Sequence, residues 1–213
     1  MDGTLIDSEP FWISAEIELV EAHGGIWTHD DGLSLVGNPM HVTASTLQGR
    51  GVDLSVDEIV DFLNGRVAAG VAAGIPWQPG ARELLDALAA AGVPMALVTS
   101  SFAVLADPFA AAVGLFGAVV SGDEVSRPKP DPEPYVLAAR KLGLDPGVCV
   151  AVEDSRSGIA SAVGSGARVL AVEVLQAVEA RAGLSIVGSL TDVSLADLGR
   201  IAAGEVLDRR RAA

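Results

Sequence analysis

The chain has 213 residues and a formal net charge of −14, and half of its residues are hydrophobic. This length suits one domain with a sizeable insertion or two modest domains, and the apolar content predicts a packed core. The acidic balance argues against nucleic acid as a partner, because a phosphate backbone needs clustered lysine and arginine. No apolar run approaches the ~18 residues of a membrane span, and a signal peptide pattern is absent, so we expect no membrane. The single cysteine, Cys149, predicts a buried thiol, no disulfide framework and a reducing cytoplasm.

The segment from about residue 11 to residue 77 predicts helices only. Ile13, Ile17 and Val20 recur at the i, i+4, i+7 spacing of one helix face, and the same spacing recurs over residues 40–47. Residues 55–58 read Ser-Val-Asp-Glu, a capping box in which the serine and the glutamate satisfy opposing backbone donors at a helix start. We therefore expect a compact helical insertion.

After residue 80 the pattern changes to short apolar strands that alternate with helices, which is typical of a parallel sheet covered on both faces. The expected strands are 93–98, 118–120, 148–152 and 169–172, with a short edge strand at 186–187, and the expected helices are 81–91, 102–113, 132–142 and 157–165. The basic residues 209–211 are interpreted as a frayed helix end. Ligands of such sheets bind beyond the carboxyl ends of the strands.

Four short polar segments lie at or shortly after expected strand ends or at the start of the chain. They are Met1-Asp2-Gly3-Thr4, Val98-Thr99-Ser100, Arg127-Pro128-Lys129-Pro130 and Val152-Glu153-Asp154-Ser155. Each segment alone also fits an ordinary structural role. A threonine or an acid after a strand often caps the next helix, and a lysine between prolines is often a solvated turn residue. Their shared order and spacing make coincidence a poor explanation.

These four segments together resemble the motifs of the haloacid dehalogenase superfamily, and they cover nearly the whole chain. The resemblance implies an α/β fold, a Rossmann-like parallel sheet core formed by residues 1–9 and 79–213, with residues 10–78 inserted as a helical cap domain. It also implies phosphoryl transfer through an aspartyl-phosphate. In the family's Asp-x-Asp-Gly-Thr loop the first aspartate is the nucleophile, and its position falls just before Met1, together with the apolar strand that carries it.

The resemblance assigns roles to the residues of each segment. Asp2 is the general acid and base, Thr99 donates to a phosphoryl oxygen, and Lys129 neutralises the phosphoryl charge. The backbone donors of Gly3 and Ser100 help to cradle the phosphate. Mg²⁺ is the implied cofactor, held by the carboxylate of Asp154 and the backbone carbonyl of Asp2, with Glu153 supporting the metal shell. Asp7 is interpreted as a loop cap.

The start of the insertion, residues 7–12, is similar to the hexitol and deoxysugar phosphatase branch, because Trp12 stands where phosphoglucomutases have histidine. Candidate substrate contacts in the insertion are Glu9, Trp12, Asn38, His41 and Arg50. Packing within the cap is an equally good interpretation for Trp12, and an isolated polar residue on a helix is more often merely solvated.

The sequence thus favours a Mg²⁺-dependent phosphatase of small phosphorylated metabolites, a sugar phosphate or a sugar-alcohol phosphate. Because the nucleophile position precedes Met1, we expect the chain as written to be inactive, and we expect a gap or a substituted strand beside 93–98 and 148–152. A phosphosugar mutase and a non-catalytic binding protein on the same fold remain alternatives. The oligomeric state stays open.

Overall fold

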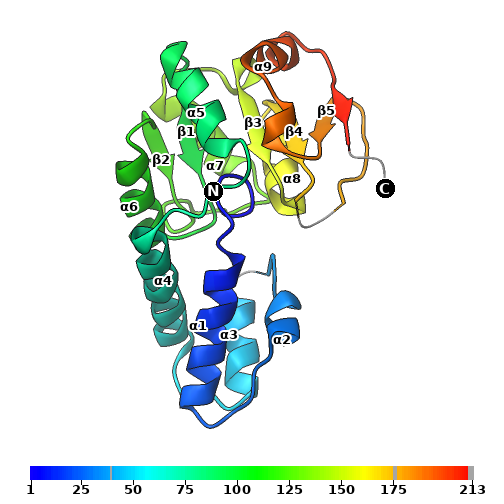
Figure 1. Ribbon diagram of the computed structural model, residues 1–213. Coiled ribbons are helices and arrows are strands. Elements are labelled where there is room, and N and C mark those ends of the chain that lie inside the picture. The colour runs from blue at the N-terminus through cyan, green and yellow to red at the C-terminus, as the bar shows by residue number, and fades with distance from the viewer. Residues whose placement is uncertain (39, 175–176, 211–213) are drawn as a thin grey trace. The chain divides into compact units, whose positions relative to one another are not determined.

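The computed structural model describes residues 1–38, 40–174 and 177–210 of the chain (Figure 1). It divides into two compact units, one formed by Met1–Asp7 with Trp77–Ala213 and the other by Ser8–Pro76. We call the first the α/β unit and the second the helical unit. Parallel strands alternate with helices in the α/β unit, so the expected α/β fold class is confirmed.

The helical unit consists of α1 (Glu9–Ala22), α2 (His29–Leu33), α3 (Met40–Gly49) and α4 (Val56–Ala73). Ser55 and Glu58 form the expected capping box at the start of α4. The apolar faces of the helices meet in a buried core that includes Ile13, Leu47 and Leu63. The short helix α2 was not expected from the spacing of apolar residues, because a capping box between Thr28 and Asp31 rather than an apolar stripe defines its start.

A buried carboxyl group lies within the helical unit. Glu16 is 4% exposed, and its Oε2 accepts a hydrogen bond from Nε1 of Trp27 at 3.1 Å. Gly32 makes room for it, since a Cβ there would lie 3.1 Å from the same oxygen. Burial raises the pKa of Glu16 from 4.5 to about 7, and the Trp27 hydrogen bond opposes only part of that rise.

This pKa predicts that the protein loses stability as the pH rises. The folded state binds the Glu16 proton more tightly than the unfolded state, so the free energy of unfolding falls between pH 4.5 and about 7. We expect a loss of about 3 kcal/mol from this group in urea unfolding at pH 8 compared with pH 4.5. Glu16→Gln should remove that difference, while the exposed Glu18→Gln should not. Equal pH dependence of both variants would contradict the assignment.

The named strands of the α/β unit pair in parallel, and the elements follow one another in the alternating order expected from the sequence. They are α5 (Ala81–Ala90), β1 (Ala96–Val98), α6 (Ala103–Val113), β2 (Ala118–Val120), α7 (Glu133–Lys141), η1 (Pro146–Val148), β3 (Val150–Glu153), α8 (Arg156–Gly164), β4 (Arg168–Val172), β5 (Leu184–Val187), η2 (Leu190–Asp192), α9 (Leu195–Ala202) and β6 (Asp208–Arg209).

Both faces of the sheet that contains β4 are covered by helices. Along β4, Leu170 and Val172 pack in a cluster with residues of α5 and α9, whereas Val169 and Ala171 pack in a second cluster with residues of α8. Successive side chains of a strand point to opposite faces, which explains this alternation. Because the strands are parallel, their carboxyl ends share one edge of the unit.

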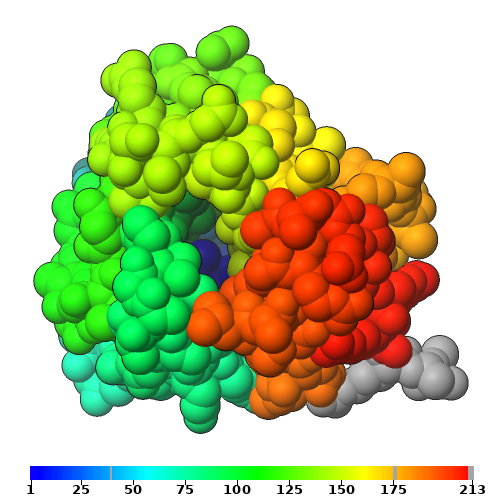
Figure 2. All heavy atoms as spheres, turned by 90° about the horizontal axis from the view of Figure 1, so that it is seen from above, coloured from blue at the N-terminus to red at the C-terminus, as the bar shows by residue number. Residues whose placement is uncertain are grey.

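The strands form two separate sheets, β1-β2 and β3-β4-β5-β6. Within the described residues, β1 pairs only with β2, and β3 pairs with β4 alone. The expected gap between β1 and β3 is therefore confirmed. Figure 2 shows a hollow in the surface of this unit, with the N-terminal residues in blue at its floor.

Several expected boundaries were wrong. β1 begins at Ala96 rather than residue 93, since Pro94 has no N–H to donate to a sheet. The segment before β3 forms the short 3-10 helix η1, capped by the Asp145 side chain, and Cys149 after it is partly exposed rather than buried as expected.

The C-terminal region also differs from expectation. β5, expected as an edge strand, lies between β4 and β6. Arg209 belongs to strand β6 rather than to a frayed helix, and its guanidinium binds both carboxylate oxygens of Asp197 at 3.0 and 2.7 Å. Arg211 lies outside the described residues.

Candidate active site

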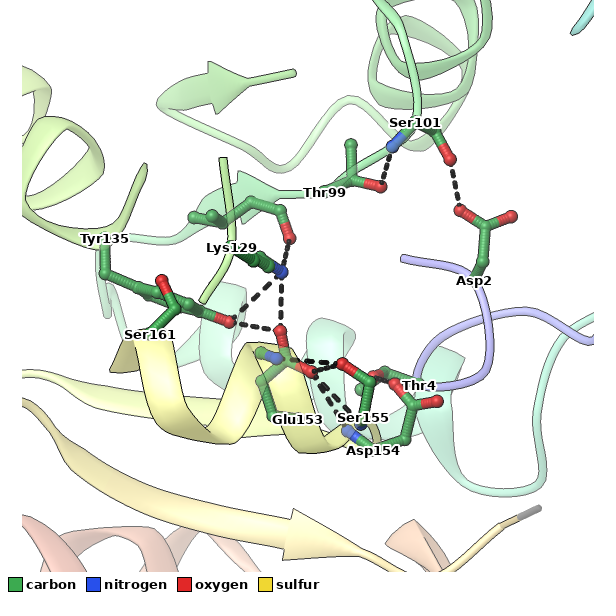
Figure 3. Close-up of polar contacts among 12 residues, drawn as sticks. Asp2, Thr4, Thr99, Ser101, Lys129, Tyr135, Glu153, Asp154, Ser155 and Ser161 are labelled. Carbon is green, nitrogen blue, oxygen red and sulfur yellow. Dashed lines mark hydrogen bonds and ion pairs between the residues drawn. The ribbon is translucent and has the colours of Figure 1, made fainter. Parts of the chain in front are cut away.

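Residues from four separate segments of the α/β unit surround one region at the carboxyl ends of β1 and β3. Figure 3 shows Asp2 and Thr4 from the first loop, Thr99 and Ser101 after β1, Lys129 from the loop before α7, and Glu153 and Asp154 at the end of β3. All four segments singled out in the sequence thus contribute to the same place. The parallel topology brings them together, because the ends of parallel strands meet at one edge.

The first loop lies directly against Asp154. The hydroxyl of Thr4 donates to Oδ1 of Asp154 at 2.5 Å. Gly3 has a φ of 73°, and a Cβ at this position would lie 2.0 Å from Oδ2 of Asp154, so only glycine fits there. Burial, with a further contribution from the neighbouring Glu153 charge, raises the pKa of Asp154, and the Thr4 hydrogen bond opposes that rise. A buried carboxylate of this kind favours a nearby cation.

Lys129 and Glu153 form a buried ion pair. The ammonium nitrogen of Lys129 lies 2.5 Å from Oε1 of Glu153, and their side chains are 7% and 5% exposed. Lys129 also donates to the carbonyl oxygen of Val98 at 3.2 Å. Burial opposes ionisation of Glu153, but the Lys129 charge and hydrogen bond outweigh it and lower the pKa of Glu153 to about 2. The Glu153 carboxylate is therefore ionised at neutral pH.

Tyr135, on α7, contacts both residues of this ion pair. Its hydroxyl donates to Oε1 of Glu153 at 2.5 Å, and its ring centroid lies 5.1 Å from the Lys129 nitrogen. Burial raises the pKa of Tyr135 well above its usual value, so the phenol keeps its proton and remains a donor. Tyr135 was not predicted from the sequence. Its position six residues after Lys129 carried no signal, because an aromatic residue on a helix usually packs in the core.

The second oxygen of Glu153 is also bonded within the protein. Its Oε2 accepts from the backbone N–H of Asp154 at 3.2 Å and from the hydroxyl of Ser155 at 3.2 Å. Gly158 lets α8 approach, since a Cβ there would lie 2.1 Å from the Glu153 carboxylate. With donors on both oxygens, Glu153 holds its neighbours in place, which fits a supporting role beside a metal rather than direct ligation.

The oxygen donors present suit a hard cation. Within the described ranges, no three side chains of histidine, cysteine, aspartate or glutamate come together as a metal-binding group. The remaining ligands from the sequence analysis are the Asp154 carboxylate and the backbone carbonyl of Asp2. Mg²⁺ is commonly bound through one or two carboxylates and keeps several waters. This donor set therefore fits Mg²⁺ better than a fully coordinated structural metal.

Thr99 and Asp2 are connected through Ser101. The backbone N–H of Ser101 donates to Oγ1 of Thr99 at 3.1 Å, and its hydroxyl donates to Oδ2 of Asp2 at 2.6 Å. Thr99 is buried. The backbone of Ser100, an exposed residue, was the predicted donor here, whereas Ser101 was not predicted. A second serine after the motif gave no signal of its contact with a residue 99 positions away.

The remaining candidate residues lie in the helical unit. Arg50 is engaged within that unit, 3.3 Å from Oδ1 of Asp31 and 5.2 Å above the ring of Trp27. Of the others, Glu9 and Trp12 lie on the first turn of α1, Asn38 precedes α3 and the exposed His41 lies on its first turn.

Comparison with known proteins agrees with this arrangement. The haloacid dehalogenase-like hydrolase family matches residues 1–166. Hexitol phosphatase A of Escherichia coli is 34% identical over 81% of this chain and 80% of its own length, and protein CbbY of Rhodobacter capsulatus is 32% identical over 80% and 81%. The crystal structure of CbbY from Rhodobacter sphaeroides in complex with phosphate has a TM-score of 0.82 at 26% identity, covering 93% of this chain and 96% of that one.

The fold and the site define a parallel α/β hydrolase of phosphoric monoesters. The chain belongs to the haloacid dehalogenase-like hydrolase family. No helix in the described part of the chain is long and apolar enough to cross a membrane.

Proposed function

We propose that this protein is a Mg²⁺-dependent phosphatase that hydrolyses a sugar phosphate or a sugar-alcohol phosphate through an aspartyl-phosphate. The observation that carries the proposal is the convergence of Asp2, Thr99, Lys129 and Asp154 from four separate segments at the ends of β1 and β3 (Figure 3). The likeness to hexitol phosphatase A supports the substrate class. The nucleophile is the carboxylate that the family motif places directly before Met1.

The chain's own residues supply most of the remaining chemistry. The nucleophile attacks phosphorus, and Asp2 gives a proton to the leaving oxygen; Asp2 then takes a proton from the water that hydrolyses the aspartyl-phosphate. Lys129 offsets the charge of the phosphoryl oxygens, and the Thr99 hydroxyl donates to one of them. The backbone N–H of Ser100 completes the cradle, whereas that of Gly3, also expected there from the sequence, donates instead to the carbonyl oxygen of Ile6 at 2.9 Å. Glu153 holds the Lys129 ammonium in place through their ion pair.

Asp154 and the backbone carbonyl of Asp2 would hold the metal, and Glu153 would support these ligands. Bound there, Mg²⁺ would neutralise part of the charge on the phosphate ester. We assign substrate selection to the helical unit, as a cap of residues 10–78, with Glu9, Trp12, Asn38, His41 and Arg50 as candidate contacts.

Loss of Mg²⁺ binding in Asp154→Ala tests the metal assignment. We expect this variant to bind Mg²⁺ at least about 10-fold more weakly than the parent in isothermal titration calorimetry, because the only assigned side-chain ligand is removed. Asp7→Asn is the matched control, since Asp7 is an exposed acid that follows the N-terminal loop in contact with Asp154 and has no assigned ligand role. Mg²⁺ affinity that is unchanged in Asp154→Ala would show that the metal site lies elsewhere.

A further inference from the structure

Ser101 occupies a position between two groups that the proposed mechanism uses. Its hydroxyl donates to Oδ2 of Asp2 at 2.6 Å, and its backbone N–H donates to Oγ1 of Thr99 at 3.1 Å (Figure 3). One residue therefore fixes both the carboxylate that transfers protons and the hydroxyl that contacts phosphate. Because the Thr99 oxygen accepts the Ser101 N–H, the Thr99 hydrogen is directed elsewhere, as a phosphate donor requires.

The backbone of Ser101 is itself held by the loop that follows β2. The N–H of Gly122 donates to the carbonyl oxygen of Ser101 at 2.9 Å. A Cβ at Gly122 would lie 2.1 Å from the carbonyl oxygen of Ser100, so the two loops meet too closely for any side chain there. The Ser101 hydroxyl is therefore presented to Asp2 from a backbone fixed by two strand ends rather than from a free loop.

We infer that Ser101 is a positioning residue that orients the Asp2 carboxyl group for proton donation to the leaving oxygen. This inference rests on the proposed phosphatase function and goes beyond it, because the family motifs assign no role to this serine side chain. The hydroxyl bonded to Oδ2 directs the transferable proton to the other carboxyl oxygen of Asp2. An acid with a fixed oxygen and a fixed angle transfers its proton more effectively than a freely rotating one.

The chemistry of the leaving group makes the inference testable. When the nucleophile attacks, the bond between phosphorus and the ester oxygen breaks, and its electron pair stays on that oxygen. A sugar-alcohol leaving group must then take the Asp2 proton, because an alkoxide is too basic to leave alone. Nitrophenolate is stable as an anion and leaves without that proton. A residue that positions the acid therefore matters for the first ester and little for the second.

The experiment compares kcat/KM for a hexitol phosphate and for nitrophenyl phosphate, since this ratio reports the step that breaks the ester bond. The enzyme used is an extended chain, residues 1–213 with a designed apolar strand ending in aspartate added ahead of Met1. We expect Ser101→Ala to lower kcat/KM for the hexitol phosphate by roughly 10- to 100-fold and for nitrophenyl phosphate by less than about threefold. Ser101→Thr, which keeps a hydroxyl, should restore most of the loss.

Ser165→Ala is the matched control, because the hydroxyl of this half-buried serine contacts only nearby backbone groups, the carbonyl oxygen of Ala162 and the N–H of Ala167, among the described residues, and lies at the C-terminal end of α8. It should change neither value. Equal losses for both esters in Ser101→Ala, or no loss for either, would overturn the inference while leaving the phosphatase proposal intact. An extended chain that hydrolyses neither ester would overturn the proposed function and the role of Ser101 with it.

Discussion

The extended chain is expected to hydrolyse a hexitol phosphate faster than residues 1–213 alone by several powers of ten. Residues 1–213 bring Asp2, Lys129 and Thr99 together (Figure 3), and the proposed mechanism uses as nucleophile the aspartate that the family motif places ahead of Met1. Loss of a nucleophile in hydrolases of comparable design costs on the order of 10⁶ in kcat. Release of inorganic phosphate, measured with Mg²⁺ present, gives the comparison directly.

A control separates chemistry from folding. The added strand should also fill the gap between β1 and β3, whose facing edges have no strand partner among the described residues. Filling it should raise the melting temperature, because buried unpaired backbone groups cost roughly 1–3 kcal/mol each. The same strand ending in asparagine should give the same rise in melting temperature without the gain in turnover. Equal turnover with either ending would rule out the aspartate as nucleophile.

Lys129→Met is expected to destabilise the fold as well as to remove the charge that the proposed mechanism uses to neutralise phosphate. The variant leaves the Glu153 carboxylate buried without its counter-ion, a change that typically costs about 3–5 kcal/mol. Lys141→Met is the control, because Lys141 pairs with Glu124 at a site where both side chains are about one third exposed. Urea unfolding at pH 7 should show the large loss in the first variant only.

The pH dependence distinguishes this explanation from a simple packing defect. In the parent, the pKa of Glu153 lies below its ordinary value, at about 2, so the stability from this pair is present above pH 4.5 and is lost as the pH falls towards 2. Without Lys129, burial raises the pKa of Glu153 instead, and the variant should regain stability as the pH falls from 7 to 4. A deficit that is constant over this range would contradict the buried-charge explanation.

Sequence reasoning went furthest where local patterns determine structure. The Ser55 capping box, the alternating strands and helices, and the gap between β1 and β3 were all predicted. Boundaries were less certain, as at Pro94, where a missing N–H shortens an apolar run that reads as a longer strand. Arg209 was misjudged because its partner Asp197 is a tertiary contact that no local pattern reveals.

The residues of the candidate site were likewise predicted only in part. The motif residues were predicted by order and spacing, and the structure brings Asp2, Lys129 and Asp154 into one region. Tyr135 and Ser101 were missed, since their importance lies in hydrogen bonds to residues distant in sequence. Positioning residues of this kind are defined by three-dimensional geometry alone.

The most direct test of the proposed mechanism is a search for the covalent aspartyl-phosphate. The extended chain would be mixed with a hexitol phosphate and Mg²⁺, quenched in acid within one turnover, and digested for mass spectrometry. The mechanism predicts a phosphoryl group on the aspartate directly before Met1. Turnover without a phosphorylated carboxylate, or a phosphoryl group on Asp2 instead, would contradict it.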